Sequence, residues 1–328
     1  FVEAGQQAGI PFTKDFNGKS QEGVSRYEHT IRGSKRCSAA RGYLHPALKR
    51  KNLHTQTDVT VERIEFEGKK ATGVTFSLKG KSFTVKANRE VILSAGALNS
   101  PQIMLRSGVG PADEIKPHGL DVVHELAGVG RNLQDHYGVV SQFECTQPVT
   151  LHRSAAWWRT QLAGVQYLLF GKGDASFPPT AAGAFFKSSD EKAVCDMQIH
   201  YVSVAVPDVH GRSDIPTSHG FSSIVYGCRP ESRGHLGLKS ASPDDAPAIF
   251  PNYLTVEQDA IDIRNGFRKT RDIFLQKAFD PYRGEQMKPS RDVNVDSDDE
   301  LDAWIRATGE TLYHPVGTCK MGSDKMSV

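Results

Sequence analysis

Alternating apolar and polar residues predict a group of strands between residues 59 and 87. A period of two is typical of strands that bury one face. Lys79-Gly80-Lys81 separates two of the runs, so we predict a hairpin over residues 72–87. The apolar positions that carry this pattern are Val59, Val61, Ile64, Phe66, Val74, Phe76, Leu78, Phe83 and Val85.

The next segment is a nearly continuous apolar run, Val91-Ile92-Leu93-Ser94-Ala95. Such a run is typical of a strand that is buried on both faces of a parallel sheet. Asn99 or Ser100 then offers an N-cap oxygen, Pro101 stands where a missing N–H costs nothing, and Gly108 is a helix stop. We predict a strand, a tight turn at Gly96-Ala97 and a helix, whose N-terminal N–H groups suit an anionic ligand such as a dinucleotide.

Longer periodic segments follow after about residue 137. The spacing predicts an amphipathic helix around Trp157 to Leu169 and a long helix over 256–276 with an apolar stripe. Ser297-Asp298-Asp299-Glu300 is a capping box that opens a further helix. Three strands are predicted between the first two helices, at residues 197–206, 222–228 and 235–240. This order favours an α/β portion joined to an α+β portion.

Composition narrows the possible functions. The 328 residues include 40 basic and 38 acidic ones, for a net charge of +2, without a long block of one sign, so nucleic acid is not an expected partner. Five cysteines without a CxxC pair predict neither a disulfide framework nor a thiolate zinc site. No apolar run reaches the roughly twenty residues of a membrane span. The chain opens with Phe1-Val2-Glu3, and we expect it to be the middle of a longer polypeptide.

Three common catalytic motifs are missing or out of place. No GxSxG elbow of a serine hydrolase occurs, and the twelve histidines include no HExxH pair, so a catalytic metal is not expected. Gly108-Val109-Gly110 looks like the start of GxGxxG, but it follows a predicted helix instead of a strand. We therefore expect no nicotinamide site there.

The segment Gly96 to Gly110, GALNSPQIMLRSGVG, resembles the second signature of the glucose-methanol-choline (GMC) oxidoreductases. The likeness covers essentially the whole chain and is closest to the alcohol and choline dehydrogenase branch. Four more segments resemble the family in the same order: CSAAR at 37–41, GRNLQDH at 130–136, PESRGHL at 230–236 and YHPVGTCKMG at 313–322.

The resemblance implies a fold in two parts. It implies a Rossmann-like FAD-binding portion of α/β class and a second, substrate-binding domain of α+β class that contains an antiparallel sheet. Family members begin with a strand and GxGxxG loop and end with a second active-site His or Asn, and we expect both to lie outside this chain. The expected domains are an incomplete FAD-binding portion over 1–137, a substrate-binding domain over 138–295, and over 296–328 the start of a return segment with the active-site His.

The resemblance also implies an activity. We expect FAD-dependent oxidation of a primary alcohol to an aldehyde, by proton abstraction and hydride transfer to flavin N5, with oxygen or another electron acceptor. The alternative is a catalytically inactive, truncated homologue that serves as a binding or scaffold module, and we expect the isolated fragment to be inactive. The expected partner is a small-molecule alcohol, and the expected location is the cytoplasm, with peripheral attachment to the inner membrane as an alternative.

The resemblance assigns site residues one by one. The plain alternative is that these are ordinary strand, turn and loop residues. His314 is the expected catalytic residue, because its motif resembles the one that faces the substrate carbon, whereas His45, His118, His200 and His219 lack such a context and are expected to be structural. The expected FAD-binding residues are Val61, Ser94, Ala95, Gly96, Asn132, Asp135 and His136.

Overall fold

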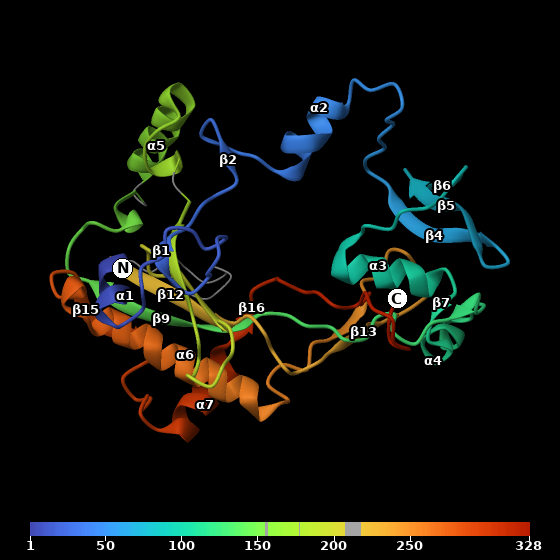
Figure 1. Ribbon diagram of the computed structural model, residues 1–328. Coiled ribbons are helices and arrows are strands. Elements are labelled where there is room, and N and C mark those ends of the chain that lie inside the picture. Colours follow the sequence, from blue (N-terminus) through green and yellow to red (C-terminus); the bar gives the residue numbers. More distant parts are fainter. Residues whose placement is uncertain (155–156, 177, 207–217) are drawn as a thin grey trace. The chain divides into compact units, whose positions relative to one another are not determined.

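The computed structural model describes residues 1–154, 157–176, 178–206 and 218–328 of the chain (Figure 1). The chain forms two compact units, and each is assembled from three separate stretches of sequence. Unit 1 comprises Phe1–Arg50, His136–Arg229 and Val256–Leu312, and unit 2 comprises Lys51–Asp135, Pro230–Thr255 and Tyr313–Val328. The predicted cofactor and substrate domains are functional assignments, and they stay a prediction.

An antiparallel sheet of seven strands forms the centre of unit 1. The order is β1-β10-β11-β12-β9-β15, and β16 also pairs with β9. The strands are β1 (Gly23–Arg26), β9 (Tyr137–Cys145), β10 (Thr180–Phe186), β11 (Met197–Val202), β12 (Gly220–Gly227), β15 (Arg283–Lys288) and β16 (Glu310–Thr311). The antiparallel sheet expected for the second domain is therefore present.

Helix α6 (Glu257–Leu275) covers one face of this sheet and confirms the helix predicted over 256–276. Its predicted stripe is buried, with Ile263, Phe267, Thr270 and Phe274 all facing the core. Gly266 lies against β11 and β12, and a Cβ there would collide with the side chain of Met197. The ring of Phe274 packs 5.4 Å from that of Phe143 and 5.0 Å from that of Phe221. The core of unit 1 thus lies between α6 and the sheet.

Helix α7 (Asp298–Thr308) begins at the predicted cap. The Ser297 hydroxyl accepts a hydrogen bond from the Glu300 amide, while the Glu300 carboxylate accepts one from the amide of Asn294. The cap at Ser297 is confirmed. The Glu300 carboxylate binds the Asn294 amide, three residues upstream of the Ser297 amide that a standard capping box uses. The label η marks a short helix of π or 3₁₀ type. The other elements of unit 1 are α1 (Val2–Gln7), β2 (Ile31–Arg32), β3 (Lys35–Arg36), η1 (Ala40–Leu44), α2 (His45–Ala47), η3 (Leu151–Ser154), α5 (Trp157–Phe170), η4 (Asp174–Ser176) and η5 (Lys277–Phe279).

Unit 2 contains the predicted hairpin as part of a three-stranded antiparallel sheet. Its strands are β4 (Thr60–Glu67), β5 (Lys70–Leu78) and β6 (Lys81–Lys86). A core of Leu105, Ile115, Val129, Leu236 and Leu238 holds the rest of the unit together. The other elements are α3 (Gly96–Arg106), β7 (Val109–Gly110), α4 (Ala112–Ile115), η2 (Lys116–His118), β8 (His124–Glu125), β13 (His235–Gly237) and β14 (Ala248–Phe250).

The strand predicted at residues 91–95 is wrong for this structure. A parallel strand exists only beside a neighbour that shares its hydrogen bonds, and no strand of the described residues pairs with this segment. Ile92 is accordingly 79% exposed. The helix start predicted at Asn99 or Ser100 is also wrong, because α3 begins at Gly96 and holds Pro101 in its interior. The predicted strands near 197–206, 222–228 and 235–240 are present, although β11 and β13 are shorter.

Among the described residues, no helix has both the length and the apolar character needed to cross a membrane.

All five cysteines are free thiols, and Cys228 is the least acidic of those with a resolved shift. Burial, followed by the nearby charge of Asp196, raises the pKa of Cys228 to about 12. At pH 8 about one part in 10⁴ of such a thiol is thiolate, against about a quarter of an ordinary cysteine. We expect iodoacetamide to alkylate Cys228 in the folded protein at least about 30-fold more slowly than the same thiol in the unfolded chain, because the lower thiolate fraction outweighs the higher nucleophilicity of that thiolate. Mass spectrometry of timed digests measures the rate, and a urea-unfolded sample is the control; equal rates in folded protein would contradict the structure.

Candidate active site

The candidate site of unit 2 is built around residues 130–135, which form isolated bridges to two other segments. On one edge, Leu133 exchanges two backbone hydrogen bonds with Gly234, at 2.9 and 2.8 Å. On the other edge, Gln134 exchanges two with Val316, also at 2.9 and 2.8 Å. Three of the motif segments that are far apart in sequence therefore lie side by side, as the strands of a small sheet would.

Asp135, at the end of this segment, fixes the backbone at His314. One carboxylate oxygen of Asp135 accepts a hydrogen bond from the His314 amide at 2.9 Å, and the other accepts one from the Tyr253 hydroxyl at 2.5 Å. His314 is exposed, so its imidazole lies at the surface of the unit. The structure thus brings two of the predicted site residues together, one as the anchor of the other.

Asn132 adds a second link between the same segments. Its backbone has a φ of +60°, and its amide nitrogen donates to the carbonyl of Gly317 at 3.1 Å. Its side-chain oxygen accepts from the Arg233 guanidinium at 3.2 Å. Gly317 has a φ of +92°, and a Cβ there would collide with the Asn132 carbonyl. A glycine is required at this close approach.

Pro101 leaves a gap in helix α3 that Thr318 fills. Proline has no N–H, so the carbonyl of Ala97, four residues earlier, lacks its helical donor. The hydroxyl of Thr318 donates to that carbonyl at 2.5 Å, and Thr318 is only 1% exposed. This contact ties the histidine-containing segment to the first turn of α3.

Val61 is held against the other end of the same helix. The guanidinium of Arg106 donates to the carbonyl oxygens of Val61 and Glu62, at 2.9 and 3.0 Å. Ser107 adds a hydrogen bond from the Ile64 amide. Burial lowers the pKa of Arg106, and its Nη1 has no hydrogen-bond partner among the described residues.

The N-terminus of α3 is open. Ser94 and Gly96 are exposed, and Ala95 is half-buried. Gly96 has a φ of +84°, and no atom lies within 4 Å of where a Cβ would be. Gly96, as the first residue of this eleven-residue helix, leaves space at the helix N-terminus, which suits an anionic group such as a pyrophosphate.

His136 falls in unit 1, where it joins a polar cluster that sequence reasoning missed. Its ring stacks on Tyr226 at 5.3 Å, and the Tyr226 hydroxyl lies 2.9 Å from His200 Nε2. The Gln198 amide nitrogen lies 3.2 Å from that same Nε2 and donates to the Tyr27 hydroxyl at 2.9 Å. The polar positions 198 and 200 alternate with buried Met197 and Ile199, and this alternation is the signal that could have found the cluster.

Desolvation makes the two phenols of this cluster still harder to ionise. Burial raises the pKa of both Tyr27 and Tyr226 above the ordinary value of a phenol. Both hydroxyls therefore stay protonated well above physiological pH and act through hydrogen bonds. Among the described residues, no group of three His, Cys, Asp or Glu side chains is arranged to hold a metal ion.

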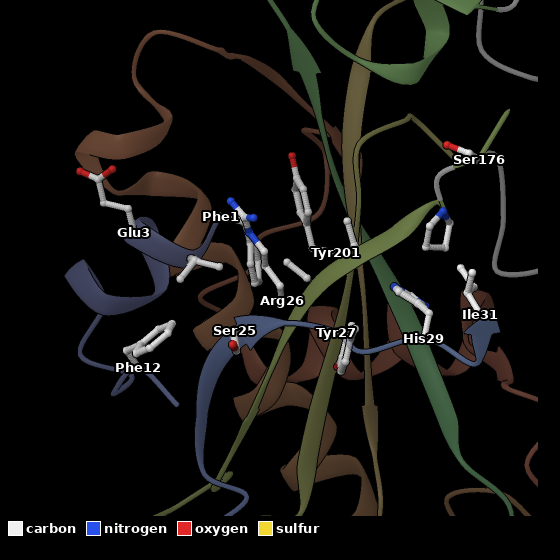
Figure 2. A pocket seen from close by; sticks show the side chains of 14 residues that line it. Phe1, Glu3, Phe12, Ser25, Arg26, Tyr27, His29, Ile31, Ser176 and Tyr201 are labelled. Carbon is white, nitrogen blue, oxygen red and sulfur yellow. The ribbon is translucent and has the colours of Figure 1, made fainter. Parts of the chain in front are cut away.

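Unit 1 also contains a cavity of about 990 Å³. Figure 2 shows the rings of Phe1, Phe12, Tyr27 and Tyr201 among the side chains that line it. The volume suits a small organic molecule. None of the predicted site residues lines this cavity.

Comparison with known proteins agrees with the motifs. Two family models, each described as GMC oxidoreductase, match residues 1–138 and 230–328. The chain belongs to the GMC oxidoreductase family. Curated GMC relatives include the oxygen-dependent choline dehydrogenases of Proteus mirabilis, 44% identical over 331 residues, and of Chromohalobacter salexigens, 42% identical over 331 residues. All of this chain matches, but it spans only 59% and 58% of those proteins.

Solved structures place the fold in the same family. Pyridoxine 4-oxidase from Mesorbium loti matches all of this chain and 60% of that one, with a TM-score of 0.85 and 25% identity. An FAD-dependent oxidoreductase from Chaetomium thermophilum matches 99% of this chain and 62% of that one, with a TM-score of 0.86 and 22% identity. The predicted family and fold class are confirmed, while the individual site residues stay a prediction.

The link between Thr318 and α3 predicts a local stability effect. Thr318→Val keeps the shape but leaves the half-buried Ala97 carbonyl without this donor, which costs about 1–3 kcal/mol. We expect the free energy of opening of α3 to fall by that amount, measured by native-state hydrogen exchange at the helical amides of residues 99–105 other than Pro101. Thr308→Val is the matched control, because the exposed Thr308 hydroxyl also donates to a helix carbonyl that water can reach. Equal effects in the two variants would show that Thr318 does not support α3.

Proposed function

We propose that this chain is part of an FAD-dependent GMC oxidoreductase that oxidises a primary alcohol to the aldehyde. Family membership supports the reaction class, and the names of the choline dehydrogenase relatives support a small alcohol as substrate. The observation that carries the proposal is the anchoring of His314 by Asp135 on a segment hydrogen bonded along both edges. The activity of the whole protein is proposed because the chain spans about three fifths of its relatives.

The residues at the N-terminus of α3 fit an FAD cofactor. Gly96 leaves the approach to the helix amides open, and Ser94 and Ala95 continue the exposed backbone beside it. FAD, when bound, supplies the acceptor for the hydride of the oxidation. We assign its binding to Val61, Ser94, Ala95, Gly96, Asn132, Asp135 and His136.

His314 acts as the general base in this proposal. A neutral imidazole accepts the proton of the substrate hydroxyl, which makes the carbinol carbon a better hydride donor. The base must be held in place, because small displacements cost large factors in rate. Asp135 and Pro315 supply that restraint on the two sides of the His314 backbone, the first by a hydrogen bond and the second by its fixed φ.

The proposed location is the cytoplasm, with peripheral attachment to the inner membrane as the alternative. The electron acceptor is left open between oxygen and another acceptor, because it depends on groups around the flavin.

Replacing His314 tests the assignment of the base. In the full-length holoenzyme, we expect His314→Ala to slow anaerobic flavin reduction by a saturating alcohol such as choline by about 10² to 10⁴, the usual worth of acid–base catalysis. FAD content should stay nearly unchanged. Stopped-flow absorbance of the flavin measures the rate.

A matched control separates the base from a general histidine effect. His45 is exposed in α2 and has no assigned role. The alcohol should therefore reduce the flavin of the His45→Ala variant at the wild-type rate. Wild-type speed in His314→Ala would mean that a different group is the base. Absence of flavin reduction by any primary alcohol in the wild-type holoenzyme would favour an inactive binding or scaffold module.

A further inference from the structure

Helix α5 presents a broad apolar face to solvent. None of its fourteen residues is buried. At 100° per residue, six large apolar side chains fall within an arc of about 140°, with Gln161 as the single polar residue among them. These side chains are 50 to 81% exposed: Trp157, Trp158, Leu162, Val165, Leu168 and Leu169.

The opposite side of α5 makes the contacts that fix the helix. The Tyr167 hydroxyl donates to the Ser34 carbonyl at 2.9 Å, and the Thr160 hydroxyl donates to the Ser154 carbonyl at 2.7 Å. Within unit 1, Figure 1 shows α5 standing away from the central sheet. The side that includes Ala163, Gly164 and Tyr167 is the half-buried one, and the six apolar side chains of the arc are left uncovered.

Charge around the helix is one-sided. No acidic residue occurs from Trp157 to Gly173, whereas Arg159 and Lys172 are exposed. The next carboxylate, Asp174, pairs with Arg153 at 2.9 Å, and hydrogen bonds from Arg153 and Ser154 lower its pKa. Within residues 157–173 the apolar face is thus bordered by two cationic side chains and by no carboxylate.

We propose that α5 is an interfacial helix that binds the surface of a bilayer containing anionic phospholipids. A helix with Trp and Leu on one face and basic residues nearby lies in the plane of the membrane interface and gains from both apolar burial and anionic lipid. Fourteen residues are too few to span a bilayer, which takes about twenty. The absence of acidic side chains favours a lipid surface over a protein partner, whose rim would need its own complementary carboxylates.

The exposed tryptophans report binding directly. The chain has three tryptophans, and Trp304 packs on Phe267 with ring centroids 5.2 Å apart. In the full-length holoenzyme, the difference between wild type and Trp157→Phe/Trp158→Phe isolates the signal of α5. We expect that signal to shift to the blue with phosphatidylcholine vesicles containing about 30% phosphatidylglycerol, and brominated lipid to quench it.

Two single substitutions of equal charge separate apolar insertion from electrostatics. Leu168→Glu lies on the apolar face, where the residue is 81% exposed, and Gln166→Glu lies on the opposite side. We expect Leu168→Glu to weaken vesicle binding at least about 30-fold, since it loses a buried leucine and adds a charge. Gln166→Glu should weaken it about five-fold at most. Co-sedimentation with vesicles measures both.

Other occupants of α5 give different results. No vesicle binding by the wild-type holoenzyme would overturn the proposal. Shielding of Trp157 and Trp158 from acrylamide without vesicles would show that the rest of the polypeptide covers the helix. A concentration-dependent dimer that Leu168→Glu dissociates, seen by light scattering, would show that a second copy covers it.

Discussion

Backbone hydrogen bonding along both edges of residues 130–135 is the constraint on which the candidate active site depends. Each edge joins this segment to a stretch of chain about 100 or more residues away. Side chains alone would leave such a junction loose, but paired amides and carbonyls fix spacing and register together. The approach is so close that a Cβ at Gly130 or Gly317 would meet a backbone oxygen of the facing segment. His314 is therefore placed by the backbone and by Asp135, before any ligand is considered.

Local signals were sufficient where one segment determines its own structure. The stripe of α6, the Ser297 cap and the β5–β6 hairpin each rest on a period or turn within about twenty residues. The prediction of a strand at 91–95 was wrong because a parallel strand forms only beside neighbouring strands. The sequence of the segment itself does not show whether those neighbours are present. Pro101 misled for a related reason. It sits inside α3 because Thr318, 217 positions further along, supplies the donor that proline lacks.

The same distinction explains which site residues could be found. Asn132, Asp135 and His314 lie in segments that resemble family motifs, and that resemblance predicted them as site residues. No pattern along the chain predicts the hydrogen bond from the His314 amide to Asp135. The polar cluster comes from strands β11 and β12 and from two residues that flank other strands; its members are Gln198, His200, Tyr226, Tyr27 and His136. A single histidine in a strand is most simply interpreted as structural. Only the strand register shows that His200 lies beside two phenols whose pKa is raised by burial.

Helix α5 shows what an apolar pattern alone does not predict. Periodicity indicates that one side of a helix is apolar, but the same pattern is found in a buried core, at a protein interface and on a lipid surface. In α6 the apolar stripe meets the sheet, whereas in α5 the polar side makes the anchoring contacts and the apolar side does not. Leaving so much apolar surface in water costs free energy that a packed helix would recover. The cationic, carboxylate-free border then gives that surface a chemical preference, since it attracts anionic headgroups at the depth where tryptophan and leucine side chains insert.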